Sequence, residues 1–310
     1  MSIASAPQPY RGVYPIAPTP FNEDESLDLE GQKRVLDCMI DQNVDGICIL
    51  ANYSEQFLLT DAERDRLLVT CLEHVAGRVP IIATCSHFST RISVERACQA
   101  EAAGADMIMM MPPYHGTALK ASESGNLTYF QRLADAISIP IMVQDAPLSG
   151  VTLSVSFLAE LARQIPQIGY FKVEVPGAAG KIRDLIAAGG ASIQGPFDGE
   201  EAITLMADLE AGATGTMPSA LLPELIRPVV MDFLLENTEQ AAETYAHILP
   251  LINFENRQCG LRATKVAMKV GGVIKSDVVR HPLEALHPET RRQLLEQAAA
   301  LDILALRWGK

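Results

Sequence analysis

The sequence predicts an α/β protein, a (β/α)8 TIM barrel followed by a C-terminal helical extension, and three observations favour this fold class. Short runs rich in Val, Ile, Met and Ala alternate with longer segments whose apolar residues recur at helical spacing. Several of these runs lack polar alternation, which is typical of parallel strands covered on both faces. No GxGxxG motif follows any of them, so a closed barrel is favoured over an open dinucleotide-binding sheet.

The strands and helices are predicted in regular alternation along the chain. Apolar runs place the strands at residues 13–17, 46–50, 80–85, 107–111, 140–144, 169–175, 192–195 and 215–218. Apolar periodicity places the intervening helices at residues 29–41, 61–75, 94–103, 127–136, 157–163, 179–188 and 200–210. Asn43, Gly104 and Gly212 each end a helical pattern before an apolar run, which predicts the same helix-to-strand turn three times.

Only helical patterns follow the last predicted strand, at residues 222–235, 239–252, 261–270 and 288–304. The first of them is predicted to be the eighth barrel helix. We therefore expect a barrel over residues 1–235 and a helical segment over residues 236–310. No linker or low-complexity stretch separates the two, so we expect one structural unit. Lys265 and Lys269 of this segment are predicted to be solvated.

Composition excludes several classes of partner. The net charge of -13 over 310 residues disfavours a nucleic-acid partner. No apolar run approaches the roughly 20 residues of a membrane span, and residues 1–5 lack the pattern of a secretion signal. We therefore expect a cytoplasmic protein without a membrane partner. The six cysteines lack CxxC spacing and are predicted to be buried free thiols, and no histidine pattern indicates a metal site.

Lys172 is the most informative single residue because it interrupts a predicted interior strand, Tyr170-Phe171-Lys172-Val173-Glu174-Val175. Lysine is seldom buried unless it is paired or has a chemical use, and a buried amine with a lowered pKa attacks a ketone to form a Schiff base. Side chains alternate along a strand, so the polar members of this run, including Lys172 and Glu174, are predicted to face the barrel interior. A lysine that reaches solvent or pairs with a carboxylate is the alternative.

Three segments then resemble the dihydrodipicolinate synthase / N-acetylneuraminate lyase family of Schiff-base enzymes. They are GVYPIAPTPF at residues 12–21, MPPY at residues 111–114 and FKVE at residues 171–174. The resemblance extends over nearly the whole chain. It implies a TIM barrel, a small-molecule 2-keto acid substrate and a homotetramer. It also implies that Lys172 is the lysine that forms the Schiff base.

The departures from the family pattern narrow the activity. The carboxylate-binding loop of the family appears here as ANYSE, in which Tyr53 and Ser54 are expected to bind the substrate carboxylate; packing alone is the alternative for Tyr53. The proton-transferring tyrosine of the family is replaced by Gln144, and the second tyrosine of PPYY by His115. The arginine of the synthases is also missing from residues 148–150, so synthase and sialic-acid lyase activities are disfavoured.

Another group must therefore transfer protons, and Glu174 is the candidate because its spacing from Lys172 places both on one strand face. A purely structural ion pair with Lys172 is the alternative. His115 and Asp145 are further candidates, as substrate-binding or orienting groups. Gly199 matches a family glycine near the Schiff base, although a helix-start turn explains it equally well. Met217 is expected to line the substrate pocket by packing.

The resemblance is greatest to the tyrosine-lacking dehydratases of the family. It implies that the substrate is L-2-keto-3-deoxyarabonate and that the products are 2-oxoglutarate semialdehyde and water, as in non-phosphorylated pentose catabolism. No metal or organic cofactor is expected. A 2-keto-3-deoxy acid aldolase and a 5-keto-4-deoxyglucarate dehydratase remain as alternative enzymes. A non-catalytic pyruvate-binding barrel is the alternative outside enzymes.

Overall fold

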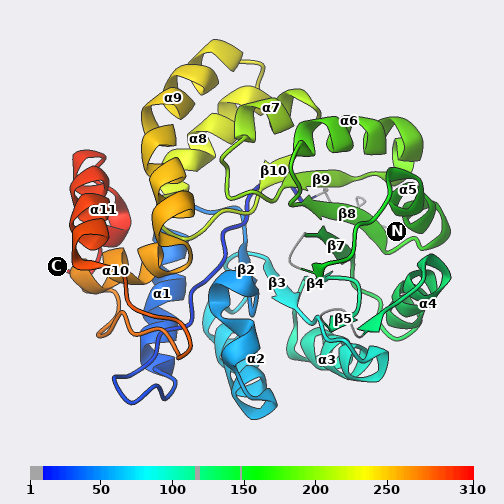
Figure 1. Cartoon of the computed structure of the whole chain (residues 1–310), viewed down its shortest axis with the longest axis horizontal. Helices are drawn as coiled ribbons and strands as arrows, with labels where there is room; N and C mark the ends of the chain where they lie inside the picture. Colours follow the sequence, from blue (N-terminus) through cyan, green and yellow to red (C-terminus); the bar gives the residue numbers. More distant parts are fainter. Residues whose placement is uncertain (1–9, 116–118, 147–148) are drawn as a thin grey trace, which may run out of the picture.

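Eight parallel strands form the centre of the computed structural model, which describes residues 10–115, 119–146 and 149–310 (Figure 1). They are β1 (Gly12–Val13), β2 (Ile47–Ile49), β3 (Ile81–Thr84), β4 (Met107–Met110), β7 (Ile141–Asp145), β8 (Ile168–Val173), β9 (Gly195–Asp198) and β10 (Gly215–Thr216). Their order in the sheet is β1-β10-β9-β8-β7-β4-β3-β2. Ile16, which continues β1, bridges Cys48 of β2 and Ser219 beyond β10, and so closes the sheet into the predicted barrel.

Helices surround the barrel in the order that the sequence predicts (Figure 1). They are α1 (Leu29–Asp41), α2 (Asp61–Val75), α3 (Thr90–Ala103), α4 (Glu123–Ala134), α5 (Val155–Gln164), α6 (Ala178–Gly189), α7 (Leu205–Glu210) and α8 (Pro223–Leu234). Two hydrophobic clusters result. One fills the barrel and includes Met142, Tyr170 and Phe197, whereas the other lies between strands and helices and includes Phe171 and Val173.

The three predicted helix-to-strand turns share one geometry. Asn43, Gly104 and Gly212 have positive φ angles of 59°, 97° and 104°. The Oδ2 atoms of Asp45 and Asp106, two residues after the first two turns, accept hydrogen bonds of 2.9 Å from Val13 N of β1 and 2.8 Å from Ile81 N of β3. These aspartates thus fix the register between adjacent strands.

The region around the seventh strand differs from the prediction. The strand lies at β9 rather than residues 192–195, because residues 190–192 form a 3-10 turn and residues 195–198 pair with both β8 and β10. Pairing on two sides outweighs the poor strand propensity of the Gly, Pro and Asp residues in β9. Helix α7 begins at Leu205 rather than residue 200, because Glu201 and Ala202 have positive φ angles of 58° and 68°.

Several short elements were not predicted from the apolar pattern. The 3-10 turns η1 (Asn52–Ser54) and η2 (Gln56–Leu58) follow β2, and the small hairpin of β5 (Tyr114–His115) and β6 (Leu119–Lys120) follows β4. They contain too few residues for a periodic pattern. All of them lie in loops that leave carboxyl ends of barrel strands, where active sites of this fold are located.

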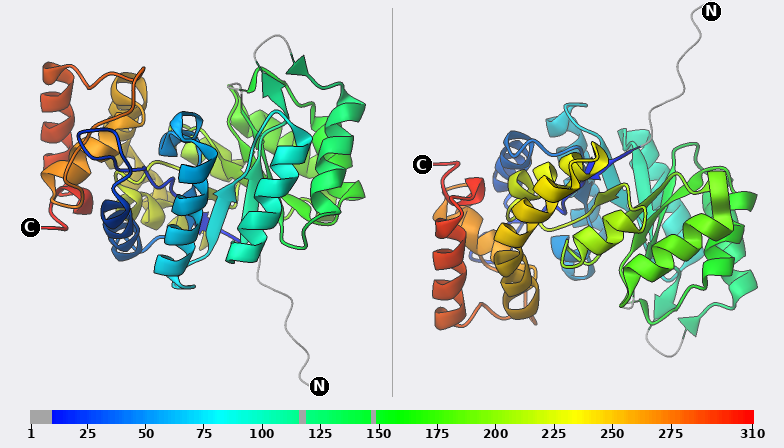
Figure 2. Two further views of the ribbon diagram at one scale, coloured as in Figure 1. Left: turned by 90° about the horizontal axis from the view of Figure 1, so that it is seen from below. Right: turned by 90° about the horizontal axis from the view of Figure 1, so that it is seen from above.

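The C-terminal helices α9 (Thr238–Phe254), α10 (Arg262–Val270) and α11 (Pro288–Ala300) pack at one edge of the barrel (Figure 2). A π-helical segment, η5 (Glu255–Cys259), continues α9. Arg34 of α1 donates a 2.9 Å hydrogen bond to Val273 O, and Trp308 Nε1 donates one of 2.7 Å to Asp41 of α1. The end of the chain is therefore held against its first helix.

Lys265 of α10 corrects one prediction, because its side chain is fully buried rather than solvated. It forms an ion pair with Glu55, which lies between η1 and η2, and its Nζ donates a 2.9 Å hydrogen bond to Val278 O. Lys269 is exposed and pairs with Asp277 at 2.8 Å. The helical spacing of the two lysines gives no information about this difference.

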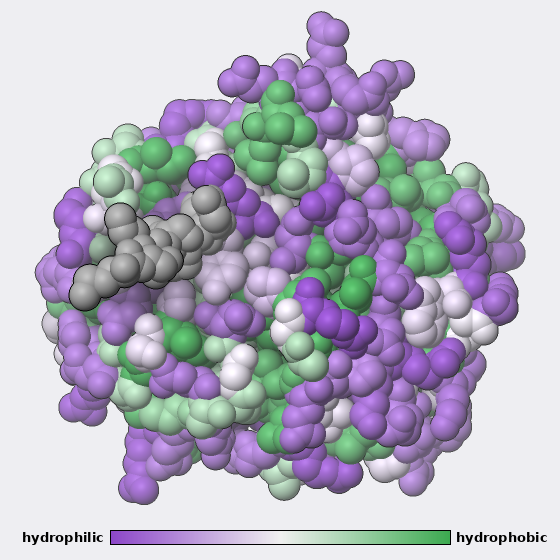
Figure 3. Space-filling view, turned by 180° about the vertical axis from the view of Figure 1, so that it is seen from behind, coloured by the Kyte–Doolittle hydropathy of each residue, from purple (hydrophilic) through white to green (hydrophobic). Residues whose placement is uncertain are grey.

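Hydrophilic residues cover most of the face shown in Figure 3, with separate hydrophobic areas between them. All six cysteines are free, as predicted, although Cys98 is exposed rather than buried. Within the described ranges, no helix combines the length and the apolar character needed to cross a bilayer.

Candidate active site

Lys172 lies near the carboxyl end of β8 and points into the barrel, as the alternation along the strand predicted. Its side chain is only 4% exposed. Two carboxylates flank its ammonium group: Glu174 Oε2 is 3.3 Å and Glu201 Oε1 is 4.0 Å from Nζ. The end of β8 and the loop after β9 therefore bring an amine and two carboxyl groups together where little solvent reaches the lysine.

The pKa of Lys172 is raised, whereas the sequence predicts a lowered one. Burial acts to lower the pKa of Lys172, but the negative charges of Glu174 and Glu201 oppose it and the net direction is upward. The resting amine is thus held as an ammonium ion. A proton must leave Lys172 before it attacks a ketone, and Glu174 is the carboxylate within closest reach.

Gln144 lies on β7 directly beside Lys172 in the sheet register. Its Nε2 donates a 2.9 Å hydrogen bond to Glu174 Oε2, the same oxygen that approaches Lys172. The buried Oε1 of Gln144 has no hydrogen-bond partner among the described residues. Gln144 therefore orients Glu174 and keeps one acceptor available.

Gly199 follows β9 and is pressed against the stem of Lys172. A Cβ atom at this position would lie 2.8 Å from Val173 O and 2.9 Å from Lys172 Cγ. The Gly199 N–H also donates a 3.0 Å hydrogen bond to Val173 O. Only glycine allows this close approach, so its role here is to let the loop after β9 pack on the lysine.

Glu201 was not among the predicted site residues. Its side chain is 9% exposed, and its buried Oε2 has no hydrogen-bond partner among the described residues. Burial raises the pKa of Glu201 well above its usual range, and Glu174 and Glu255 add to this shift against the opposing charge of Lys172. The acidic pair Glu200-Glu201, five residues after the strand predicted at 192–195, was the available signal, but the prediction of a helix from residue 200 obscured it.

The C-terminal segment η5 supplies two further polar groups that the sequence did not reveal. Tyr53 Oη donates a 3.4 Å hydrogen bond to Asn256 Oδ1. The neighbouring Glu255 is 2% exposed, and burial raises its pKa to about 8 despite the Ser219 hydroxyl. Burial, together with Glu201 and Glu255, also raises the pKa of Tyr53. This segment falls between the predicted helices at residues 239–252 and 261–270, so the apolar pattern made no prediction for it.

The hydroxyl of Ser54 is engaged near its own loop. It donates a 2.6 Å hydrogen bond to Ala17 O and accepts one of 3.2 Å from Ala51 N. The side chain therefore shapes the loop that carries Tyr53. Met217 is fully buried in the cluster that fills the barrel, in agreement with a packing role.

Asp145 is a correction to the predicted site, because it lies on the opposite face of β7 from Gln144. Its Oδ2 is 2.5 Å from Lys181 Nζ of α6, and Lys181 in turn donates a 2.6 Å hydrogen bond to Leu153 O. The period of two along a strand turns Asp145 toward the helices when Gln144 faces inward. Pro147 and Leu148, which follow in the same segment, lie outside the described residues.

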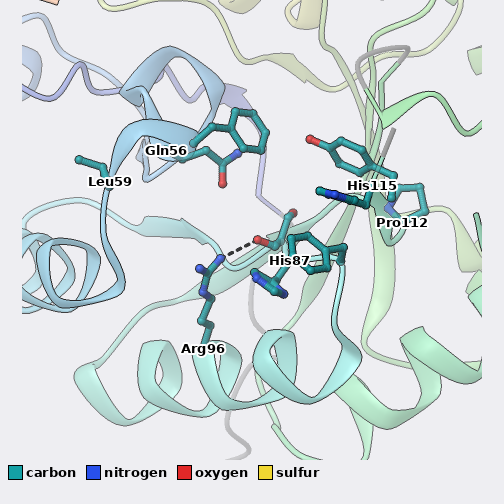
Figure 4. Close-up of a pocket in the computed structure, with 10 residues that line it drawn as sticks. Gln56, Leu59, His87, Arg96, Pro112 and His115 are labelled. Carbon is teal, nitrogen blue, oxygen red and sulfur yellow. Dashed lines mark hydrogen bonds between the residues drawn. The ribbon is translucent and has the colours of Figure 1, made fainter. Parts of the chain in front are cut away.

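His115 lies apart from the lysine, on the exposed hairpin after β4, where it borders a separate cavity of about 320 Å³ (Figure 4). The cavity is lined by Gln56, Phe57, Leu59, Ser86, His87, Phe88, Arg96, Pro112, Tyr114 and His115. Its described lining does not include Lys172 or Glu174. The ring of Phe88 lies between those of His87 and His115, with centroid distances of 4.0 and 4.8 Å. Within this chain His115 therefore does not join the site around the lysine.

Comparison with known proteins agrees with this architecture. The model of the dihydrodipicolinate synthetase family matches residues 9–301. An L-2-keto-3-deoxyarabonate dehydratase of Azospirillum brasilense is 53% identical over 309 residues, which cover 100% of both chains. A 4-hydroxy-tetrahydrodipicolinate synthase of Streptomyces coelicolor is 30% identical over 97% of this chain and 98% of its own length.

The solved structure of dihydrodipicolinate synthase from Aquifex aeolicus superposes with a TM-score of 0.88 at 22% identity, covering 95% of this chain and 99% of that one. At that identity the similarity concerns the fold alone. The fold and the buried lysine define a barrel of the Schiff-base class. The chain belongs to the dihydrodipicolinate synthetase family.

Proposed function

We propose that the protein is a Schiff-base-dependent dehydratase that converts L-2-keto-3-deoxyarabonate to 2-oxoglutarate semialdehyde and water. The observation that carries this proposal is the buried group of Lys172 and Glu174 with Gln144 in place of the tyrosine of the family. The relative from Azospirillum brasilense, a dehydratase of this substrate by name, supports the choice of reaction.

Lys172 begins the proposed reaction. Glu174 accepts the ammonium proton, and the free amine attacks the C2 ketone to form a carbinolamine. Glu174 then returns the proton to the carbinol hydroxyl, which leaves as water and gives an iminium ion. The positive nitrogen acidifies the protons on C3. Glu174 is close enough to the resulting imine nitrogen to remove one of these protons, because it already lies 3.3 Å from Nζ. The enamine that results expels the C4 hydroxyl as water.

The polar groups of the site suit a hydroxylated substrate. Three buried side-chain oxygens, Gln144 Oε1, Glu201 Oε2 and Glu255 Oε1, have no hydrogen-bond partner among the described residues. Buried acceptors without partners are costly, and hydroxyl groups of a bound substrate would satisfy them. An apolar 2-keto acid would leave them unsatisfied. This favours a sugar acid over a simple 2-keto acid.

The 3-10 turn η1 supports binding of the substrate carboxylate. The first N–H groups of such a turn, those of Asn52 and Tyr53, have no partner within the turn, and helix starts favour anions. The backbone and ring of Tyr53 therefore keep the predicted carboxylate-binding role, whereas the hydroxyl of Ser54 is already engaged.

Product analysis tests the proposal directly. The protein is incubated with 2-keto-3-deoxy-L-arabonate, and the products are identified by mass spectrometry. Formation of 2-oxoglutarate semialdehyde (2,5-dioxopentanoate) is expected. Pyruvate with glycolaldehyde would instead establish an aldolase, and exclusive turnover of 5-keto-4-deoxyglucarate would establish the other dehydratase. Recovery of the sugar acid unchanged would show that the proposed substrate is wrong.

We also propose that the protein assembles as a homotetramer in the cytoplasm. The exposed aromatic rings of Phe57 and Phe88, 57% and 46% accessible beside His115, are apolar surface that a second copy would cover. Light scattering after size-exclusion chromatography is expected to give four times the mass of one chain. A monomeric mass would contradict this assembly.

A further inference from the structure

The loop after β9 presents Glu201 to the Schiff-base lysine in a conformation that the chain maintains against its own preference. Glu201 and Ala202 both have positive φ angles, 58° and 68°, which are unfavourable for residues with a side chain. Asp198 holds the loop, since its carboxylate accepts hydrogen bonds of 3.2 Å from Glu200 N and 2.9 Å from Ala202 N. Together with the contact of Gly199 on Lys172, this fixes Glu201 next to the lysine.

The two carboxylates beside Lys172 have different surroundings. Glu174 is 24% exposed and receives a hydrogen bond from Gln144, whereas Glu201 is 9% exposed and its Oε2 has no partner among the described residues. One buried ammonium cannot balance two buried carboxylates, so one of them is favoured to bind a proton. Glu201 is the less solvated of the two, and its pKa is raised accordingly.

We infer that Glu201 is the general acid that protonates the departing C4 hydroxyl, while Glu174 is the base at C3. This inference rests on the proposed dehydratase function and identifies its second proton-transferring group. The substrate is tethered at Nζ through C2, so its C4 hydroxyl lies only a few bonds from that atom. Glu201 Oε1 is 4.0 Å from Nζ and thus within range of this hydroxyl.

The two carboxyl groups account for both protons that move during the elimination. The Glu174 carboxylate takes a C3 proton, and the electron pair forms the enamine. The enamine pair then forms the C3=C4 bond as the C4–O bond breaks, and the Glu201 acid gives its proton to the oxygen, which leaves as water. Afterwards Glu174 is protonated, Glu201 is ionised, and Lys172 is again part of an iminium ion.

The second half of the reaction restores both groups. The Glu201 carboxylate removes a C5 proton, and Glu174 returns its proton to C3. The resulting enol loses its hydroxyl proton and gains one at C4 to become the aldehyde, without an external oxidant or reductant. Hydrolysis of the iminium frees Lys172 and the product.

Deuterium exchange into the methyl group of pyruvate separates the role of Glu174 as base from that of Glu201 as acid. Exchange of the pyruvate methyl group in D2O, followed by proton NMR, needs the Schiff base and the C3 base but no leaving group. Glu201→Gln is expected to keep the exchange rate within about threefold of the wild type and to lose dehydration by roughly 10²–10⁴-fold. Glu174→Gln is expected to lose both. Glu200→Gln, a partly exposed neighbour on the same loop, is the matched control and is expected to keep both.

A substrate analogue with fluorine in place of the C4 hydroxyl tests the proton transfer itself. Fluoride leaves without being protonated, so Glu201→Gln is expected to release fluoride within about tenfold of the wild-type rate. Loss of exchange together with dehydration, absence of fluoride release, or dehydration equal to that of Glu200→Gln would each overturn the assignment. If Glu201→Gln does not fold, Glu201→Asp is measured in the same way and must keep exchange better than dehydration.

The failure of the proposed function has a different result. A wild-type protein that exchanges pyruvate protons but leaves the sugar acid unchanged overturns the proposed dehydratase and, with it, the role of Glu201. A wild-type dehydratase in which Glu201→Gln is as active as Glu200→Gln overturns the role of Glu201 alone.

Discussion

Two buried lysines, Lys172 on β8 and Lys265 on α10, show how similar pairings with carboxylates serve different purposes. Both side chains are almost inaccessible, at 4% and 0%. The Lys265 ammonium is held by Glu55 and by a backbone carbonyl, and it lies 4.3 Å from the centre of the Phe21 ring. Lys172 has longer contacts to its carboxylates, and oxygens around it have no hydrogen-bond partner within the part of the chain that the structure describes.

The difference shows what distinguishes a reactive buried lysine from a structural one. The Glu55 carboxylate is also satisfied by the Arg280 N–H at 3.0 Å, so every group of the Lys265 pair has a fixed partner. The pKa of Lys265 is nevertheless lowered by burial, to about 8, whereas that of Lys172 is raised after the charges of Glu174 and Glu201 are included. Neighbouring polar atoms without partners among the described residues, rather than a lowered pKa, therefore distinguish the proposed reactive lysine from the structural one.

Replacing Lys172 gives the largest expected effect on activity. Lys172→Ala is expected to reduce turnover to background and to abolish the adduct that borohydride traps with pyruvate, because no other amine occupies this position. The free energy of unfolding is expected to change by no more than about 2 kcal/mol. Mass spectrometry of the trapped protein and urea unfolding measure the two effects. An active variant would eliminate the Schiff-base mechanism.

Replacing Glu174 is expected to leave the lysine functional but slow the chemistry. Glu174→Gln preserves the shape and the contact with Gln144, so the borohydride-trapped adduct should still form, although more slowly, because water or Glu201 must then accept the ammonium proton. Dehydration is expected to fall by roughly 10²–10⁴-fold, the usual contribution of a general base. Steady-state dehydration rates, compared with the yields of the trapped adduct, test this prediction. A near wild-type rate would reduce Glu174 to a structural partner of the lysine.

Breaking the Lys265 pair is expected to destabilise the protein. Lys265→Met leaves Glu55 buried without its cation and should cost about 3–5 kcal/mol of unfolding free energy. Adding Glu55→Gln should recover most of this loss, because it removes the uncompensated charge. Lys269→Met, which breaks the exposed pair with Asp277, is the matched control and should cost about 1 kcal/mol or less. Equal losses in urea unfolding for Lys265→Met and the control would contradict the comparison.

Replacing Glu255 is expected to change how the stability of the protein depends on pH. Its folded-state pKa of about 8 lies above its ordinary value of 4.5, so the folded protein binds more protons between these pH values. Stability from this group is therefore complete below pH 4.5 and is lost as the pH rises through 8. Glu255→Gln should remove a pH-dependent loss of unfolding free energy on the order of a few kcal/mol.

Thermal unfolding at pH 5 and pH 8.5 measures this dependence. The melting temperature of Glu255→Gln is expected to fall less between the two pH values than that of the wild type. Glu239→Gln, at an exposed position near the start of the same helix, should behave like the wild type. Identical pH dependence in all three proteins would show that Glu255 does not titrate as its burial indicates.

Local patterns accounted for much of the fold and part of the site. The predicted ranges for α1 and α2 coincide with the observed helices, since their apolar spacing and polar starting residues are encoded within the segments themselves. The inward direction of Lys172 followed from the period of two along a strand. The same period of two, applied to Asp145, would have turned it away from Gln144 and toward the helices, where it pairs with Lys181.

The sequence by itself determined the barrel, the strand that carries Lys172 and the place of Glu174, because each depends on residues close together in the chain. Only the tertiary structure decided which carboxylates and amines meet. Glu201 reaches Lys172 from the next strand, and Lys265 meets Glu55 across 210 positions. Such contacts depend on the closure of the sheet and the packing of the last helices. Local periodicity gives no information about these contacts. The contacts distinguish the lysine proposed for chemistry from the lysine that stabilises the fold.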